Sequence, residues 1–378
     1  GSADKDGGKH AKGIRMFFDQ FPVATSSNDF AKINQLFDMS MMFRLLKKQN
    51  LVPANIKGNE ERFIAFLKNL MPPVLCNPIQ GIHYKRYEIR NVRFLREEQE
   101  ALVYVRMWDA DQIQSKMRWW LHRENGLWRA YDLEILEFSM RYSTMMGVGM
   151  KLGSEKDPSM NQFPKLNEGI ALMAQGDGQK ALSIFRSLKN AGFPPVLESM
   201  RLYGLSACLT DTGEFQEAIL AVDKALALNS DMPMMHWVYA MCYNGLGEHE
   251  KALKHANEYA DLLGKDGNYY SEVGDAYLGL GEKDQALRAY RKGIADDPKS
   301  AGFFVLDLMK VLPKGDRKEI LTHYERLANL EDRFVELGEY LVGNEDADTL
   351  RTLVEVHRHF LPNDENLEFY ETALKEMK

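Results

Sequence analysis

Cysteine is scarce in this sequence of 378 residues, which contains only Cys76, Cys208 and Cys242. Three widely spaced cysteines cannot form a disulfide framework or a four-cysteine zinc site. Long apolar runs are also lacking, since none approaches the roughly 20 residues needed to cross a bilayer. Positive charge is not in excess, because 48 Lys and Arg stand against 55 Asp and Glu, a formal net charge of −7. This balance argues against a generic nucleic-acid binder, which needs clustered positive charge.

Catalytic signatures are missing as well. The sequence has no Gly-rich phosphate loop, HExxH helix or Gly-x-Ser-x-Gly elbow. His357 and His359 are separated by one residue and diverge on a helix, so they do not form a metal pair. Strand alternation places Asp132 beside Glu134, away from the apolar stripe, as a hydrogen-bonded surface or structural residue. We therefore expect no enzyme activity, no cofactor and no metal site.

The strongest pattern that is present is a repeat in the second half. Gly213, Gly247, Gly281 and Gly315 are spaced by 34 residues, and small alanines follow them at Ala218, Ala252 and Ala286. An earlier copy contains Ala181. A period of 34 is that of the tetratricopeptide (TPR) repeat, in which each unit is a helix pair. The segment GDAYLGLGEKDQALRAYRKGIADDP resembles the TPR consensus over nearly its whole length.

The resemblance implies an all-α TPR superhelix. After Pro298 the pattern decays, but amphipathic segments continue to the end of the chain. We expect four clear repeats, two degenerate ones and a capping helix over residues 161–378, because terminal repeats need a polar outer face.

In the TPR family the first helix of each pair lines an inner surface that binds a protein or peptide. When the first-helix positions that face this inner surface are assigned in the present sequence, they are rich in methionine and aromatic residues. Such a surface suits a partly apolar partner. The same residues also fit ordinary core packing or packing between domains. The predicted partner-binding residues are Met200, Tyr203, Met234, Trp237, Met241, Asn244, Asp275 and Leu278.

The first half has a different pattern. Ser27 or Asn28 could cap one helix running through FAKINQLFDMSMMFRLLKKQ, and Asn59 could cap a second that Pro72 and Pro73 end. Four segments rich in aromatic and branched residues follow, and Asn125-Gly126 joins the last two as a hairpin. This predicts an α+β domain over residues 14–155, with helices packed on an antiparallel sheet, after a disordered lead-in over residues 1–13.

This layout resembles the nuclear transport factor two-like cone fold. Within that group it is most similar to the periplasmic phospholipid-transport (toluene-tolerance) substrate-binding family, on FDMSMMFRLL, NEERFIAFLKNLM and GLWRAYDLEILEFSMRYS. The resemblance implies a bacterial protein that carries a lipid or small apolar ligand inside the cone. The pocket residues would be Phe37, Met41, Phe66 and Trp119. It also favours export, although the sequence leaves a cytoplasmic location open.

Charge is divided unevenly along the chain. Residues 1–160 contain 24 Lys and Arg against 19 Asp and Glu, and the remainder contains 24 against 36. The basic residues cluster on the predicted strands. Three explanations remain open: a solvated sheet face, docking against the acidic repeats, or an anionic partner.

The leading functional hypothesis is a non-catalytic interaction scaffold, with a lipid or small-ligand carrier as the alternative.

Overall fold

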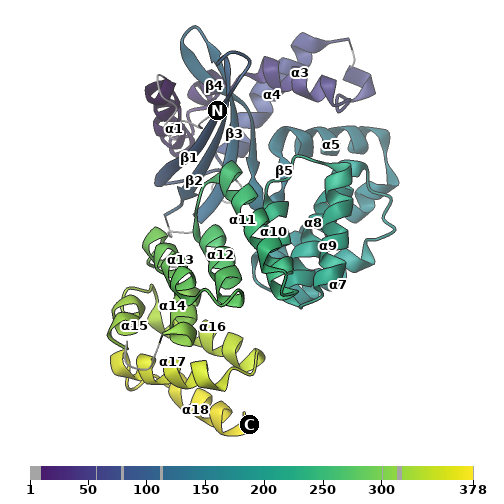
Figure 1. Ribbon diagram of the computed structural model, residues 1–378. Coiled ribbons are helices and arrows are strands. Elements are labelled where there is room, and N and C mark those ends of the chain that lie inside the picture. Colours follow the sequence, from purple (N-terminus) through teal and green to yellow (C-terminus); the bar gives the residue numbers. More distant parts are fainter. Residues whose placement is uncertain are drawn as a thin grey trace. The chain divides into compact units, whose positions relative to one another are not determined.

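The computed structural model describes residues 10–56, 58–77, 81–110, 114–299, 301–312 and 317–377 (Figure 1). The chain forms two compact units. The first comprises Gly1–Val238 with Leu262–Gly264, and the second Tyr239–Asp261 with Lys265–Lys378. Residues 1–9 of the predicted lead-in lie outside the described residues. Its last part was predicted wrongly, because helix α1 (Ala11–Ser26) already begins within it.

The first unit contains a five-stranded antiparallel sheet in the order β1-β2-β3-β4-β5 (Figure 1). The four predicted strands are present, and Asn125 and Gly126 join β3 to β4 with positive φ angles of 49° and 81°. Both conformations are those of a tight hairpin turn. The short last strand was not predicted. The strands are β1 (Arg86–Leu95), β2 (Glu100–Trp108), β3 (Gln114–Glu124), β4 (Leu127–Ile135) and β5 (Met140–Arg141).

The single helix predicted from residue 30 onwards is two helices, α2 (Phe30–Leu36) and α3 (Met39–Lys48). The caps are Asp29 and Asp38, whose carboxylates accept from backbone N–H groups. Between the helices Phe37 is extended and bridges to Ala130 of β4. The backbone N–H of the next residue, Asp38, donates to the Ala130 carbonyl at 2.7 Å. The predicted helix is interrupted here because Phe37 and Asp38 pair with the sheet instead of continuing the helix.

The next helix, α4 (Glu60–Leu75), begins at the predicted cap, since the Asn59 side chain accepts from the Arg62 N–H. It does not end at Pro72 and Pro73, which lie inside it. Pro72 cannot donate to the Lys68 carbonyl four residues earlier. That carbonyl instead accepts from Asn34 Nδ2 at 3.1 Å, so the helix continues with its backbone group satisfied.

Helix α1 packs on one sheet face and fills the core with aromatic side chains. Phe17, Phe18 and Phe21 all lie around the indole of Trp119, with ring centroids 5.1–5.7 Å away. All four side chains are at most 2% exposed. Helix α5 (Tyr142–Glu155) also contacts β4 and leads towards the repeats.

A β-bulge in β4 changes the predicted alternation. Trp120 pairs with Asp132, whereas the next residue of β3, Leu121, pairs with Ala130, so Tyr131 is an extra residue. Beyond this bulge the faces exchange, and Leu133 joins Ala130 in the hydrophobic core. Asp132 and Glu134 therefore lie on the opposite face, and they are buried, at 0% and 1% exposure. Of the two alternatives predicted for Asp132, a surface or a structural residue, the structure supports the second, because the buried carboxylate accepts from the backbone N–H and the hydroxyl of Ser143.

Helix pairs follow from residue 163, as the repeat pattern predicts. In the first unit they are α6 (Phe163–Ala174), α7 (Gly178–Ser187), α8 (Pro195–Asp211) and α9 (Phe215–Leu228), and α10 (Met234–Gly245) contains the division between the units. The predicted domain boundary near residue 160 lies where helix pairs begin, between α5 and α6. The division between the two compact units lies elsewhere, within α10.

The second unit is entirely helical in its described residues (Figure 1). Its helices are α11 (His249–Leu263), α12 (Gly267–Gly279), α13 (Lys283–Asp296), α14 (Gly302–Val311), α15 (Arg317–Tyr324), α16 (Leu330–Gly343), α17 (Ala347–Phe360) and α18 (Asn366–Glu376). Helices α14 to α17 are the two degenerate pairs, and α18 packs on α17 and α16 as the last helix.

The recurring small residues occupy the positions that the repeat requires. Gly213, Gly247 and Gly281 have φ angles of 76°, 76° and 80°, so each ends a first helix in the left-handed region. Gly315 lies outside the described residues. The four recurring alanines, at 181, 218, 252 and 286, are 0% exposed, because each sits where the two helices of a pair meet.

Candidate functional site

Three of the predicted partner-binding residues lie in the interior of the first unit. Met200, Tyr203 and Met234 are 5%, 4% and 2% exposed. Met200 also lines an apolar cavity of about 340 Å³ that is shared with β4 and the end of α4. In the free chain these three side chains are packing residues.

Trp237 and Met241 lie one turn apart on α10 and are both half-buried. The indole Nε1 of Trp237 is buried without a hydrogen-bond partner among the described residues. Both side chains retain part of their surface, which is the condition for contact with a partner.

The predicted residue Asn244 bridges two helices of the second unit. Its Nδ2 donates to the backbone carbonyl of Glu272 at 2.9 Å and to the Glu272 carboxylate at 3.1 Å. Its Oδ1 lies 3.3 Å from Nδ1 of His249. These contacts hold the amide in place on the first-helix side of α10 and α12.

Asp275 and Leu278, the last two predicted residues, lie on α12, and Asp275 is exposed. Its carboxylate accepts from the hydroxyl of Tyr290 at 2.8 Å. On the next first helix, Asp307 of α14 is mostly buried, and Lys310 Nζ lies 3.8 Å from its carboxylate. Burial, and then the negative charge of Asp275, raise the pKa of Asp307 to about 7.

Two exposed aromatic rings that the sequence did not identify continue this surface. Phe303 of α14 and Tyr340 of α16 are 42% and 43% exposed, and their rings meet edge to face with centroids 5.2 Å apart. Lys310 Nζ lies 5.7 Å from the Tyr340 ring centroid. We call Asp275, Asp307, Phe303, Lys310 and Tyr340 the α12–α16 strip.

Asp275 was predicted, but the part of the strip on α14 and α16 was not. The TPR pattern decays after Pro298, so the positions that face the inner surface could not be assigned in these two helices. One signal was available. Asp307 follows Asp275 by 32 residues, close to the period of the repeat.

The four predicted ligand-pocket residues do not surround one described cavity. Phe37 and Trp119 are 0% exposed and belong to the packed aromatic core. Met41 lines a pocket on the other side of the sheet, and Phe66, at 44% exposure, lines a surface pocket beside α4. The region between α1 and the sheet is filled by the three phenylalanines of α1.

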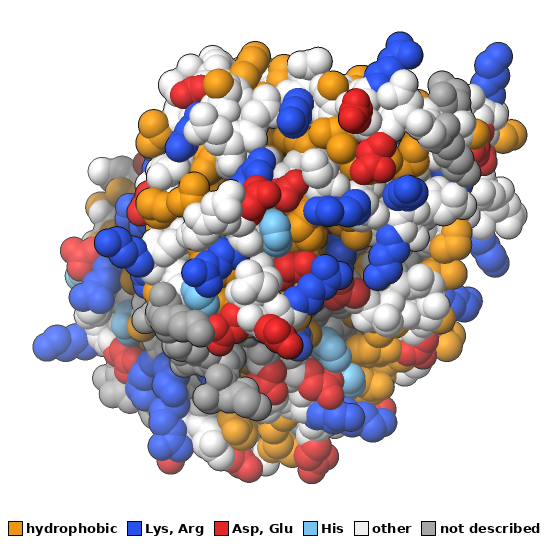
Figure 2. Space-filling model, turned by 90° about the horizontal axis from the view of Figure 1, so that it is seen from above, with side chains coloured by type: hydrophobic (Ala, Val, Ile, Leu, Met, Phe, Trp, Pro, Cys, Tyr) orange, Lys and Arg blue, Asp and Glu red, His pale blue; other side chains and the backbone are white. Residues whose placement is uncertain are grey.

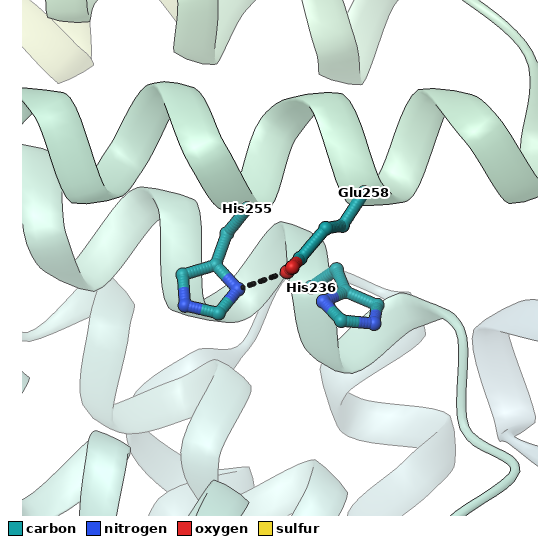
Figure 3. Close-up of side chains that lie close together, drawn as sticks. All are labelled: His236, His255 and Glu258. Carbon is teal, nitrogen blue, oxygen red and sulfur yellow. Dashed lines mark ion pairs between the residues drawn. The ribbon is translucent and has the colours of Figure 1, made fainter.

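His255 has a defined setting within the second unit. Its Nδ1 lies 2.9 Å from a carboxylate oxygen of Glu258, one turn along α11 (Figure 3). Its ring also stacks on Tyr239 and Tyr243 of α10, at centroid distances of 4.6 and 5.5 Å. The histidine thus links the two helices of this repeat.

A buried Tyr–His–Asp chain lies near the end of the second unit. The Tyr324 hydroxyl is 2.8 Å from Nδ1 of His357, and Nε2 of His357 is 2.7 Å from the Asp364 carboxylate. Burial lowers the pKa of His357, and Asp364 opposes this shift. Such groups can serve in acid–base catalysis, but Tyr324 and His357 are both 0% exposed. A substrate has no access to them, so the arrangement is structural.

The basic strands dock against the repeats within the first unit. Arg118 of β3 is 1% exposed; it donates to the Glu134 carboxylate and, from Nη1, to Asp231 at 2.7 Å. Arg141 donates to the other oxygen of Asp231 at 2.8 Å. Asp231 belongs to the repeat segment before α10. Of the three explanations for the charge asymmetry, docking is the one that accounts for Arg118.

On the face that Figure 2 shows, charged side chains of both signs are interspersed. Among the residues described, no helix combines the length and the apolar character that a membrane crossing requires.

Comparison with known proteins bears on the helical part. Residues 209–266 match the family profile described as tetratricopeptide repeat. A curated relative, small glutamine-rich tetratricopeptide repeat-containing protein 2 of Mycosarcoma maydis, is 31% identical over 87 residues, which are 23% of this chain. The match spans only a quarter of that relative's length.

Solved structures similar to this chain include a tetratricopeptide repeat protein from Parabacteroides merdae, with a TM-score of 0.40 and 15% identity over 62% of this chain and 91% of the other. A thermophilic TPR protein of Thermus thermophilus aligns with a TM-score of 0.35 and 19% identity over 57% and 99% of the two chains. The helix pairs, the glycines at the 34-residue period and the matching profile agree with one another. Residues 209–266 of this chain match the tetratricopeptide repeat, and they lie within a run of helix pairs that follows an antiparallel sheet domain.

Proposed function

We propose that this chain is a non-catalytic scaffold that binds a partly apolar protein segment on the α12–α16 strip. TPR proteins generally mediate protein–protein interactions. The observation that carries the proposal is the exposed edge-to-face pair of Phe303 and Tyr340 on neighbouring first helices. Aromatic residues are enriched in protein interfaces, and a few of them supply most of the binding energy.

The surroundings of the aromatic pair support a mixed partner. Lys310 lies between the rings and the carboxylates, contacting Tyr340 on one side and Asp307 on the other. Asp275 and Asp307 place two carboxyl groups on the same surface. A partner segment with an apolar side chain for the rings and a basic side chain for the carboxylates would complement both features. Met241, Asn244 and Leu278 would extend this surface along α10 and α12.

A random peptide library selected on the full chain tests this proposal. The affinity of a selected peptide is then measured by fluorescence anisotropy for wild type and for Phe303→Ala with Tyr340→Ala. We expect the double variant to weaken binding by at least about tenfold, the effect of losing about 1.4 kcal/mol.

The matched control is Phe369→Ala, which removes an aromatic side chain that is 64% exposed on α18, outside the strip. Its affinity should equal that of wild type. Selected peptides that bind the double variant as tightly as wild type would contradict the proposal.

A second candidate function, the carriage of a small apolar ligand, is favoured by the cavity of about 340 Å³ in the first unit. Its wall is almost entirely apolar, and the volume falls within the range of small-ligand sites. The lining includes Leu75, Leu133, Ile135, Met140 and Met200. Solvent extraction of the chain purified from its native source, followed by mass spectrometry, tests this role. Recovery of a stoichiometric lipid, with no protein partner, would place carriage above the scaffold.

A further inference from the structure

A second cavity, of about 620 Å³, opens on the sheet face opposite the aromatic core, within the first unit. Trp120 on this face is the neighbour of Trp119, whose side chain points into the core. The cavity is therefore separate from the region between α1 and the sheet. Helix α3 forms one wall and the β1–β2 turn another, and the residues used below are Arg44, Lys48, Arg96, Glu100, Trp120 and Arg141.

Two cations on α3 face this cavity without a carboxylate. Arg44 and Lys48 are one helical turn apart, so they project from the same side of the helix. Both are exposed, and neither has an ion-pair partner in the part of the chain that the structure describes. Two like charges at this spacing repel each other mildly, and a bound anion would remove that cost.

The acidic lining residue, Glu100, is already neutralised. It is 6% exposed; one of its oxygens lies 2.8 Å from Arg96 Nη1, and the other accepts from the Tyr131 hydroxyl at 3.0 Å. Glu100 therefore offers little repulsion to an incoming anion. The Arg44 and Lys48 charges remain uncompensated at the cavity wall.

The turn that carries Arg96 has an unusual backbone. Arg96, Glu97 and Glu98 have φ angles of 48°, 54° and 65°, so three successive residues with side chains adopt the left-handed conformation. Each such residue is energetically unfavourable, and residues of this kind concentrate at functional sites. This turn places Arg96 at the cavity and within reach of Glu100.

An aromatic and aliphatic wall completes the cavity. The guanidinium of Arg141 stacks on Trp120, with Cζ 4.0 Å from the ring centroid, and pairs with Asp231 on its other side. Trp120 is 4% exposed, and Met41 and Leu45 of α3 also line the cavity. Apolar walls with a few convergent charged groups are typical of small-molecule sites.

We propose that this cavity binds the oxyanion of a small molecule, a phosphate or a carboxylate, whose attached apolar group lies against Trp120, Met41 and Leu45. Arg44 and Lys48 supply charge-assisted hydrogen bonds to the oxyanion. This site is independent of the proposed partner-binding strip, which lies in the second unit.

Isothermal titration calorimetry with the full chain tests the proposal. Phenyl phosphate and benzoate are size-matched probes for the two anion classes, inorganic phosphate lacks the apolar group, and phenol lacks the charge. We expect phenyl phosphate or benzoate to bind more tightly than phenol and inorganic phosphate. If phenyl phosphate binds and benzoate does not, the ligand is assigned as a phosphate. If benzoate binds and phenyl phosphate does not, it is assigned as a carboxylate.

The decisive variant is Arg44→Glu with Lys48→Glu, in which both substituted side chains are exposed. It should weaken binding of the probe by at least about tenfold. The control, Lys47→Glu with Lys68→Glu, makes the same change of net charge at exposed residues that do not line the cavity, and should bind as wild type does. The proposal is overturned if neither anionic probe binds, if phenol binds equally well, or if both double variants lose affinity alike.

Discussion

Arg118 and Asp231 connect the sheet to the repeats through a hydrogen bond of 2.7 Å between Nη1 and Oδ1. A second bond of 2.9 Å runs from Nη2 to the Asp231 backbone carbonyl. Because Arg118 also donates to Glu134 on the neighbouring strand, one buried guanidinium serves two carboxylates from different parts of the first unit. The basic strands and the acidic repeats thus meet in at least one specific contact.

Arg118→Met should destabilise the first unit by about 3–5 kcal/mol, because it leaves the Glu134 carboxylate buried without its partner. Urea denaturation followed by tryptophan fluorescence measures this loss. Combining it with Glu134→Met removes both buried charges, and the double variant should recover most of the lost stability. An unfolding free energy of Arg118→Met equal to that of wild type would show that the pair contributes nothing.

Asp307 should make stability depend on pH. Its pKa is about 7 in the folded chain, against about 3.9 in an unfolded one, so the folded state binds the extra proton between these values. The contribution of Asp307 is therefore fully present below pH 4 and is lost as the pH rises through 7. Asp275 adds to the shift and Lys310 opposes it.

Asp307→Asn removes this dependence. Relative to wild type, the variant should gain roughly 1–3 kcal/mol of unfolding free energy between pH 5 and pH 8, since one pKa unit corresponds to about 1.36 kcal/mol. Urea denaturation of both proteins at the two pH values gives the difference. A constant difference across this range would contradict the assigned ionisation.

Gly274→Ala should destabilise the second unit by about 1–3 kcal/mol, the usual effect of overpacking a core. A Cβ atom at Gly274 would overlap the ring of Tyr290, which is 0% exposed and held by its bond to Asp275. Thermal denaturation provides the measurement. Gly343→Ala is the control, because a Cβ there meets nothing within 4 Å; its melting temperature should not fall.

His357→Phe should lower the free energy of unfolding by about 2 kcal/mol or more, because the Tyr324 hydroxyl and the Asp364 carboxylate both lose the imidazole as a hydrogen-bond partner. The loss should appear as faster amide hydrogen exchange in α17 and as a lower urea midpoint. His359→Phe changes an exposed histidine two residues away and should alter stability by no more than about 0.5 kcal/mol. Equal effects of the two substitutions would mean that the buried chain is not what stabilises this region.

Local sequence signals predicted the elements well where one interaction dominates. The 34-residue spacing of Gly213, Gly247 and Gly281 indicated helix pairs, because a left-handed residue must end each first helix. Asn125-Gly126 indicated the β3–β4 hairpin for a similar reason. The predictions failed where a distant group intervened: Phe37 breaks a helix by pairing with β4, and Asn34 satisfies the carbonyl that Pro72 leaves free.

The candidate site was only partly predictable. Asp275, Asn244 and Leu278 followed from the repeat register, whereas Phe303 and Tyr340 lie where that register has decayed. Met200 and Met234 fit the inner-face pattern, yet the structure buries them. A methionine at helical spacing is compatible with core or surface, and only the neighbouring elements determine which it is.

By itself, then, the sequence determined that this chain joins an antiparallel sheet domain to TPR helix pairs, and that its basic and acidic residues are divided between them. Backbone conformation and hydrophobic period are local properties, so they can be read along the chain. Tertiary structure alone decided that Arg118 is buried against Asp231, that a bulge at Tyr131 exchanges the faces of β4, and that Phe303 meets Tyr340. Each depends on groups far apart in the sequence, whose burial and pairing arise only when the chain has folded.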